Sequence, residues 1–253
     1  MSTGAVGAKA QRNLSGQRLG RKGRETRSRI IAAVGRLVGE PNAQPLSLSA
    51  IARETSVTMT TLYLYFADLE ELVLAALEPV VAELHPLVEM LETRWSDEHL
   101  GACCVKFIDR YAEYWAKHSR MLHLRNKFAT ERDVRFYQLQ LRSSRPLLNA
   151  LARQMDGDGE RLGPALYTAA FLLTGVEHLA TVLTDQDVRY LVYDSVAKGL
   201  EEPVRSRARI AEARVLELAI RDQREHIAKG LKSDRAAASS RGGKKLGGSP
   251  RTG

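Results

Sequence analysis

The feature that most constrains this chain is the pattern of residues 46–72, LSLSAIARETSVTMTTLYLYFADLEEL. Its apolar residues fall at helical spacing in two short groups, with the segment ETSV (residues 54–57) between them. The apolar positions are Leu48, Ile51, Ala52, Val57, Leu62 and Phe66. Ser47 and Thr58 are suitable N-caps, because each hydroxyl can accept a hydrogen bond from a free N–H in the first helical turn. The segment therefore predicts two short helices joined by a tight turn, a helix-turn-helix.

These residues also resemble a known family. The order Ile51-Ala52, Val57-Thr58, Thr61-Leu62-Tyr63, Tyr65-Phe66 and Glu70-x-Leu72 is similar to the N-terminal domain of bacterial TetR-type transcriptional repressors. A preceding helix over residues 25–39 has the family's position and inward pattern, with Ile30, Ile31, Ala33, Val34, Leu37 and Val38 facing the core. The resemblance ends near Leu77. It implies an all-α fold, in which a three-helix N-terminal helix-turn-helix domain precedes a larger helical ligand-binding and dimerisation domain.

Two residues depart from the family pattern. Ser56 occupies the turn position where the family has Gly, and a left-handed conformation costs Ser about 1 kcal/mol more than Gly. We therefore expect another turn geometry. Leu69 stands where the family has a Lys that points at a DNA phosphate, so one expected backbone contact is lost.

The positive charge of the chain lies at its two ends. Residues 1–24 contain six Lys/Arg and no acidic residue, and residues 229–253 contain seven Lys/Arg and one acidic residue. Because the formal net charge of the whole chain is +8, residues 25–228 carry −4. The basic composition is therefore weak evidence for nucleic-acid binding by the body, and the stronger evidence is the motif.

Composition also bears on location. Of the 253 residues, 44% are hydrophobic, which is enough for a core, and the absence of an apolar run near 18 residues predicts no membrane span. The first 24 residues lack the apolar segment of a secretory signal. Cys103 and Cys104 are the only cysteines, and adjacent cysteines offer neither a ready disulfide nor a metal spacing. A cytoplasmic protein without metal or cofactor is expected.

Four regions are predicted along the chain. Residues 1–23 form a disordered basic arm, 24–77 the DNA-binding domain, 78–228 the helical ligand-binding and dimerisation domain, and 229–253 a disordered basic tail. Within the third region we expect connector helices over 69–94, kinked or split at Pro79 and Pro86. Further helices are expected over 97–118, 121–128, 132–155 (interrupted by Pro146), 160–184, 186–200 and 201–228.

DNA contacts are assigned to the start of the second motif helix and to its flanks. The base-reading candidates are Thr58, Met59, Thr60 and Thr61, because the first residues of such a helix reach base edges. Thr can bond to several bases, and the Thr and Met side chains can touch a thymine methyl group. Tyr63 and Tyr65 are phosphate donors by the resemblance, or core residues with the hydroxyl at the rim. Ser47 is a cap that can also meet a phosphate.

The basic arm has two interpretations. Arg21, Lys22 and Arg24, together with Arg18, form a glycine-spaced strip ahead of the first helix. Such an arm can reach into an adjacent minor groove. It can equally be a solvated leader that adds only nonspecific charge.

The resemblance implies an effector pocket and a dimer. Candidate ligand-binding residues are Tyr111, Trp115, His123, Asn126, Tyr137, Phe171, Thr174, Glu177 and His178, although most of the aromatic ones can equally be plain core. The helix at 160–184 is rich in small and apolar residues, as close helix packing requires. The family places this helix at a two-fold interface, and an internal core helix is the alternative.

The expected function is sequence-specific transcriptional regulation by a homodimer, released from a palindromic DNA operator by an unidentified small-molecule effector. An enzyme is not expected, because no catalytic triad, phosphate-binding loop or metal constellation is found in the sequence. The rival is an architectural protein whose basic tails bind DNA without sequence preference.

Overall fold

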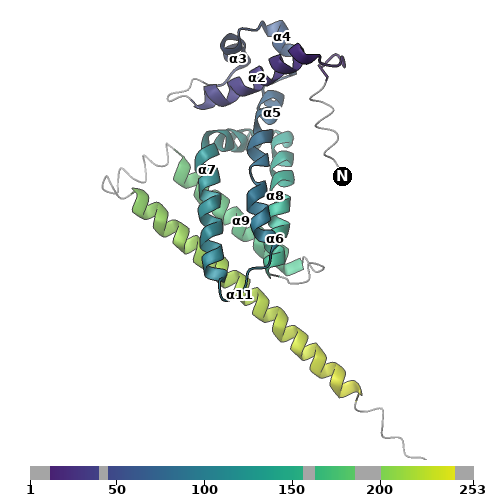
Figure 1. Ribbon diagram of the computed structural model, residues 1–253, viewed down its shortest axis with the longest axis vertical. Helices are drawn as coiled ribbons and strands as arrows, with labels where there is room; N and C mark the ends of the chain where they lie inside the picture. Colours follow the sequence, from purple (N-terminus) through teal and green to yellow (C-terminus); the bar gives the residue numbers. More distant parts are fainter. Residues whose placement is uncertain (1–11, 40–44, 156–162, 186–200, 243–253) are drawn as a thin grey trace, which may run out of the picture. The chain divides into compact units, whose positions relative to one another are not determined.

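The fold is α-helical throughout the residues that the structure describes, and no strand occurs among them (Figure 1). The structure is a computed structural model that describes residues 12–39, 45–155, 163–185 and 201–242. Its helices are α2 (Arg21–Gly39), α3 (Leu48–Thr55), α4 (Met59–Tyr63), α5 (Leu69–Ala82), α6 (His85–Glu92), α7 (Leu100–Thr130), α8 (Val134–Met155), α9 (Gly163–Thr184) and α11 (Glu201–Gly242). The predicted all-α fold class is confirmed.

The chain divides into two compact units. The first contains residues 1–85, 114–144 and 184–186, and the second contains residues 86–113, 145–183 and 187–253. This division differs from the predicted boundary between residues 77 and 78, because residues 114–144 cluster with the N-terminal helices. Two ion pairs join α5 and its C-cap residue to that segment: Glu78 with Arg142 at 2.9 Å, and Glu83 with Lys117 at 2.6 Å.

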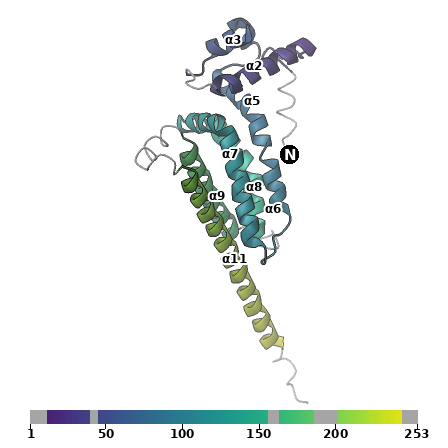
Figure 2. The same cartoon turned by 60° about the vertical axis from the view of Figure 1, so that its left-hand side comes forward.

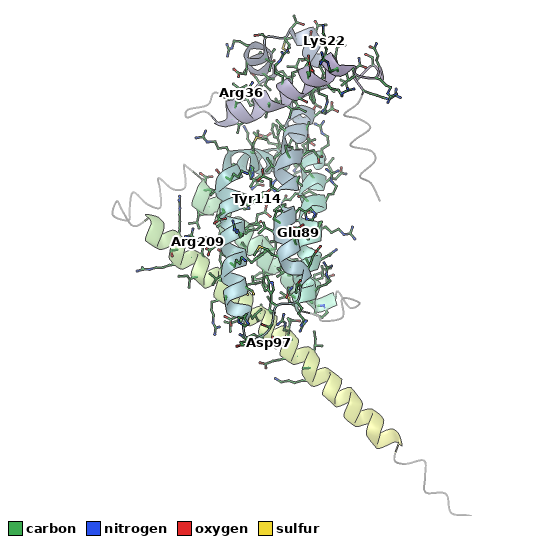
Figure 3. All side chains as sticks on the ribbon, in the orientation of Figure 1. Lys22, Arg36, Glu89, Asp97, Tyr114 and Arg209 are labelled. Atoms are coloured by element: carbon green, nitrogen blue, oxygen red, sulfur yellow. The ribbon has the colours of Figure 1, made fainter. Side chains whose placement is uncertain are left out.

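The N-terminal helices of the first unit pack around a small core. Ile30, Ala33 and Val34 of α2 are fully buried, as the helical spacing predicts, while the other three predicted inward residues are half-buried. The buried side chains that α3, α4 and α5 contribute to the unit are Ile51, Ala52, Thr55, Leu62, Leu72, Val73, Ala76, Leu77 and Val80. Arg36 of α2 and Glu54 of α3 also pair at 2.9 Å on the surface (Figure 3). The motif therefore rests on ordinary apolar burial.

Figure 2 shows the ribbons of α6, α8 and α11. In the second unit, Gln154 of α8 bonds to backbone groups at the end of α6, and Arg224 of α11 bonds to Gln154. Its side chain is 1% exposed, accepts a hydrogen bond from the Trp95 amide at 3.0 Å, and donates to the Leu91 and Thr93 carbonyls at 2.8 Å each. The guanidinium of Arg224 on α11 donates to the Gln154 carbonyl at 2.9 Å. One buried amide thus satisfies backbone groups that the end of α6 leaves without helical partners.

Ion pairs hold α11 against the first half of α7 and against the segment just before it. Arg209 and Asp109 pair at 3.3 Å, and Arg224 and Asp97 pair at 2.5 Å (Figure 3). The pKa of the Asp97 carboxyl lies below its usual range, mainly because this carboxyl accepts a hydrogen bond from the Arg224 guanidinium. α11 therefore belongs to the second unit along the part of the helix whose side chains are described.

Several predicted helix breaks are wrong. The two helices predicted over 97–118 and 121–128 are one helix, α7, which runs unbroken from Leu100 to Thr130. Pro79 and Pro146 lie inside α5 and α8 without ending them. Both prolines are exposed, so the carbonyl that loses its helical donor can face water. The expected split occurs only at α6, where Pro86 is the second residue. The predicted helix over 186–200 lies outside the described residues.

The predicted disorder of the two ends is also wrong where the structure describes them. Residues 12–18 form a closed turn, here called the arm turn, and α2 already begins at Arg21. At the other end α11 continues to Gly242. Composition favoured disorder because these segments contain few apolar residues. Extending a helix that is already packed avoids the unfavourable nucleation step, so the extension can form without further burial.

The expectation that no segment could span a membrane meets one candidate, α9. By length and composition alone, Gly163–Thr184 is long and apolar enough to cross a membrane, and it is the one such helix among the described residues. Core helices of soluble proteins pass the same test. Ala165, Ala169, Leu172 and Leu173 bury one face of α9 within the second unit.

Candidate nucleic-acid interface

The first motif helix, α3, is capped at both ends as a short helix requires. The Ser47 hydroxyl accepts a hydrogen bond from the Ala50 amide at 3.2 Å, which confirms the predicted cap. Ser56 ends the helix with φ 53° and ψ 40°, in the left-handed region. The expectation of another turn geometry is therefore wrong. The Ser56 amide donates to the Arg53 carbonyl and the Val57 amide to the Ala52 carbonyl, so backbone bonds hold the strained residue in place.

The second motif helix, α4, presents a small uncharged surface. Thr58 caps it by accepting from the Thr61 amide at 3.1 Å, as predicted, and the two hydroxyls lie 2.9 Å apart. Thr58, Met59 and Thr60 are exposed and Thr61 is half-buried. Met59 is 37% exposed although it is a large apolar residue. Beneath them Leu62 is fully buried, so the base-reading candidates lie together on the outer side of an anchored helix.

The two tyrosines after the cap differ in environment. Tyr63 is 49% exposed at the end of α4, where its hydroxyl is free to meet a phosphate. Tyr65 is half-buried, and a Cβ added to Gly23 of α2 would lie 3.7 Å from its hydroxyl oxygen. Tyr65 therefore packs beside the start of α2 with its hydroxyl at the rim. The geometry favours the phosphate-donor interpretation for Tyr63 and the core interpretation for Tyr65.

The arm turn lies against the end of α4. The Leu14 amide donates to the Leu64 carbonyl at 2.9 Å, one residue beyond Tyr63. Within the turn, Arg12 and Arg18 form an antiparallel bridge, and the Asn13 side chain accepts from the Gln17 amide at 2.8 Å. Gly16 has φ 79°, which only glycine adopts without strain. The arm is thus ordered from Arg12 onward.

Basic side chains gather on this arm and on the start of α2. Arg12, Arg18, Arg21, Lys22 and Arg24 are all exposed (Figure 3 labels Lys22). Arg21 has Glu25 at 3.7 Å, and Arg24 donates to the Leu19 carbonyl at 2.9 Å. The sequence interpretation missed the fold of the arm, although the Asn13-x-x-Gly16 spacing is a turn signal.

The start of α5 is acidic. Asp68 caps the helix by accepting from the Glu71 amide at 2.6 Å, and Glu70 and Glu71 occupy the first turn. These carboxylates suit the positive end of the helix dipole and would repel a phosphate. Arg135 of α8 donates to both Asp68 oxygens, at 3.1 and 2.9 Å, and also binds Asp133. Its hydrogen bonds lower the pKa of Asp133. No phosphate contact is therefore expected where the family has Lys.

Three of the predicted ligand-binding residues come together in the first unit. The rings of Trp115 and His123 lie 6.1 Å apart at an edge-on angle, and His123 is 3.1 Å from the Thr184 hydroxyl. Asn126 accepts two hydrogen bonds from Arg125, whose guanidinium also lies 5.8 Å from the Trp115 ring. The cluster combines an aromatic ring with polar groups of the kind that line small-molecule sites, and Trp115 and Arg125 are buried at its centre.

The remaining candidates lie in different surroundings. Tyr111 is 5% exposed and belongs to the core of the second unit. Tyr137 on α8 is 56% exposed. On α9, Phe171 is 80% exposed, Thr174 and His178 are exposed, and Glu177 is half-buried. The aromatic residues on the outer side of α9 suit a protein partner better than an enclosed ligand.

Comparison of the sequence with protein-family models and with curated proteins finds no match. The resemblance to TetR-type repressors stays a prediction that depends on the motif residues.

Proposed function

We propose that this chain is a cytoplasmic, sequence-specific DNA-binding regulator of transcription. The observation that carries the proposal is the α3–turn–α4 unit, in which two capped helices on a buried core expose Thr58, Met59, Thr60 and Tyr63 on one side. Side chains at the start of the second helix of such a unit reach base edges in a major groove. The proposed function is DNA binding and control of transcription, without catalysis of a reaction.

Base reading by α4 uses short side chains only. Thr hydroxyls bond to several bases, and the Met59 side chain can touch a thymine methyl group. The start of α4 offers no bidentate Arg, Asn or Gln. Sequence-dependent DNA shape therefore supplies part of the specificity, and the basic arm is placed to sense it. Tyr63 positions the helix through a phosphate, which contributes affinity without sequence information.

A homodimer is the second element of the proposal. Tyr167 and Phe171 of α9 are 78% and 80% exposed, and they lie one turn apart on the side opposite the buried alanines. A second copy of the chain would cover these rings in a two-fold interface. The two α4 helices would then lie about 34–36 Å apart, or a multiple of that, to enter successive major grooves of a palindromic operator.

The third element is release by a small-molecule effector. The cluster of Trp115, His123, Arg125 and Asn126 supports an effector with aromatic and hydrogen-bonding character. Since these residues belong to the same unit as the motif, an effector there can alter the free energy of the DNA-binding conformation. We propose repression relieved by the effector.

The test is recovery of genomic fragments bound by the purified protein, followed by binding measurements on the enriched sequence. Met59→Ala and Thr60→Ala should change the preferred bases. Tyr63→Phe should weaken binding to all sequences about equally, because a phosphate contact does not specify sequence. An unchanged base preference in both alanine variants would refute the assignment of α4.

The alternative function is an architectural protein whose basic ends bind DNA without preference. The two functions differ in competition with bulk DNA: a regulator retains a preference of about 10³-fold or more for its operator, and an architectural protein does not. Sedimentation at micromolar concentration tests the dimer. Gly175 on α9 has open space around it, so Gly175→Arg should give folded monomers that lose specific binding. A monomeric unsubstituted protein would overturn the dimer.

A further inference from the structure

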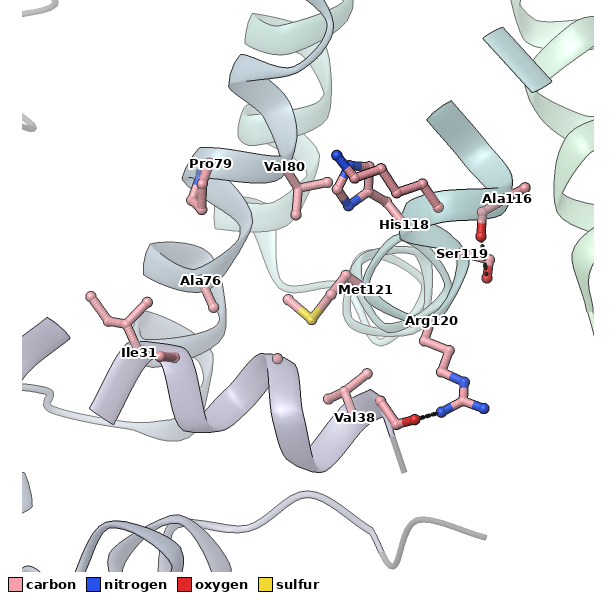
Figure 4. A pocket seen from close by; sticks show the side chains of 14 residues that line it. Ile31, Val38, Ala76, Pro79, Val80, Ala116, His118, Ser119, Arg120 and Met121 are labelled. Carbon is pink, nitrogen blue, oxygen red and sulfur yellow. Dashed lines mark hydrogen bonds between the residues drawn. The ribbon is translucent and has the colours of Figure 1, made fainter. Parts of the chain in front are cut away.

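An open groove lies inside the first unit, and neither α4 nor the residues of the Trp115 cluster line it. It encloses about 530 Å³ between the second half of α2, the second half of α5 and residues 116–121 of α7. Figure 4 shows its floor, to which Ile31, Val38, Ala76, Val80 and Met121 contribute apolar side chains. The volume is within the range of about 300–1,000 Å³ typical of small-molecule sites.

Small residues leave the groove open. Ala32, Gly35 and Gly39 lie along one side of α2 and line it together with Ala76 of α5. A Cβ added to Gly35 or Gly39 would meet no heavy atom within 4 Å. Ala32, Gly35 and Gly39 are exposed, so this side of the groove is open to solvent. The surfaces of α2 and α5 are thus shaped to leave room, and any occupant gains apolar burial.

The rim of the groove is basic. Lys117 Nζ and His118 Nε2 both bond to one oxygen of Glu83, at 2.6 and 2.9 Å, and these two bonds hold the pKa of the Glu83 carboxyl below its usual range. The guanidinium of Arg120 donates to the Gly39 carbonyl, and no carboxylate within the described ranges forms a salt bridge with it. Lys117 and Arg120 carry two positive charges and Glu83 carries one negative charge, so the described residues of the rim have an excess of positive charge.

We propose that this groove binds a small amphipathic anion, with an aromatic or aliphatic body on the apolar floor and a carboxylate or sulfonate at Arg120 and Lys117. The apolar floor selects against a bare inorganic anion, and the basic rim selects against a purely apolar molecule. The inference depends on the groove alone and does not need the proposed DNA-binding function.

The test uses 8-anilinonaphthalene-1-sulfonate as the probe and the full chain without DNA. Gly35→Leu fills the groove from the exposed side of α2, where a new side chain meets open space. Gly163→Leu is the matched control, because that glycine on α9 is also surrounded by open space and does not line the groove. We expect Gly35→Leu to remove one fluorescent binding component per chain, and Gly163→Leu to retain it.

A second comparison tests the charge. Arg120→Gln should weaken the same component by roughly fivefold, the size expected for one charge-assisted contact. N-phenyl-1-naphthylamine, the neutral analogue of the probe, should bind this site several-fold more weakly and should not respond to Arg120→Gln.

Three results would overturn the inference. The first is a titration of Gly35→Leu that superimposes on that of the unsubstituted protein. The second is equal loss in Gly163→Leu, which would place the probe elsewhere. The third is complete displacement of the probe by millimolar inorganic phosphate, which would indicate a simple anion site. Circular dichroism confirms the fold, and Ala32→Phe, which fills the groove from the next turn of α2, repeats the test if Gly35→Leu does not fold.

Discussion

Removing the charges of the N-terminal arm gives a direct measure of how the proposed regulator holds DNA. α4 carries no cation and the start of α5 carries three acidic residues, whereas the basic arm is bonded to the residue that follows α4, through the Leu14 amide and the Leu64 carbonyl. Arg12 and Arg18 are exposed on the arm turn, and Lys22 is exposed in the first turn of α2. The perturbation is the triple substitution Arg12→Gln, Arg18→Gln, Lys22→Gln.

The expected magnitude follows from counterion release. Each phosphate neutralised by a protein cation changes the slope of log affinity against log salt by about 0.9. The proposed dimer loses three cations per chain, so the slope should flatten by about 5 if all reach phosphates and by about 3 if half do. Between about 50 and 200 mM salt, a slope difference of 5 changes the affinity ratio of the two proteins by about 10³.

The assay is a titration of the operator by fluorescence anisotropy at four salt concentrations. The matched control removes the same charge from exposed positions of the second unit: Lys106, Arg153 and Arg207, each replaced by Gln. Its slope should stay within about one contact of the unsubstituted protein. If the arm variant and this control give the same slope, the arm is a solvated leader and the reasoning fails.

Three further substitutions test individual features of the structure. Gln154→Leu leaves backbone groups at the end of α6 without partners, and it should lower the free energy of unfolding by about 3 kcal/mol and the melting temperature by about 6–12 °C. The control Gln138→Leu, on the exposed side of α8, should change the melting temperature little. Equal shifts in the two variants would contradict the buried network. Ser56→Gly should raise the free energy of unfolding, measured in urea, by up to about 1 kcal/mol, because the backbone strain removed at φ 53° exceeds the entropy that glycine adds to the unfolded chain. A destabilised protein would contradict the left-handed turn. Burial raises the pKa of Glu212 to about 7, so the folded chain binds this proton more tightly and loses stability as pH rises from 5 to 8. Glu212→Gln should flatten that decline, and an unchanged pH profile of melting temperature would exclude the burial of this carboxyl.

Local interactions account for the features that the sequence predicted well. Ser47 and Thr58 were recognised as caps because a cap bonds to an amide three residues later, and this spacing is visible in the sequence. The buried positions of α2 follow from the period of a helix in the same way. The exposed surface of α4 can then be predicted as well, since it is the side opposite the buried one.

Features that depend on distant contacts could not be predicted. Arg135 binds Asp68 across 67 positions of the chain, and nothing near either residue indicates the pair. The helix-breaking tendency of Pro79 and Pro146 is a local rule that tertiary packing overrides when the affected carbonyl faces water. Phe171 was assigned to a ligand site only because it is aromatic, although it lies on the exposed side of its helix.

The order of the arm turn also has an energetic consequence for the proposed function. A segment that becomes ordered only on DNA costs about 1–2 kcal/mol per residue at binding, whereas a turn that is closed in the free protein has met that cost in folding. Gly16→Val retains every charge but strains the turn at φ 79°, by about 1–2 kcal/mol. It should weaken operator binding by up to about tenfold per arm while leaving the salt slope unchanged, since the number of cations is the same. An unchanged affinity would show that the arm binds equally well without the turn. A flattened slope would show instead that the turn positions its arginines on the phosphates.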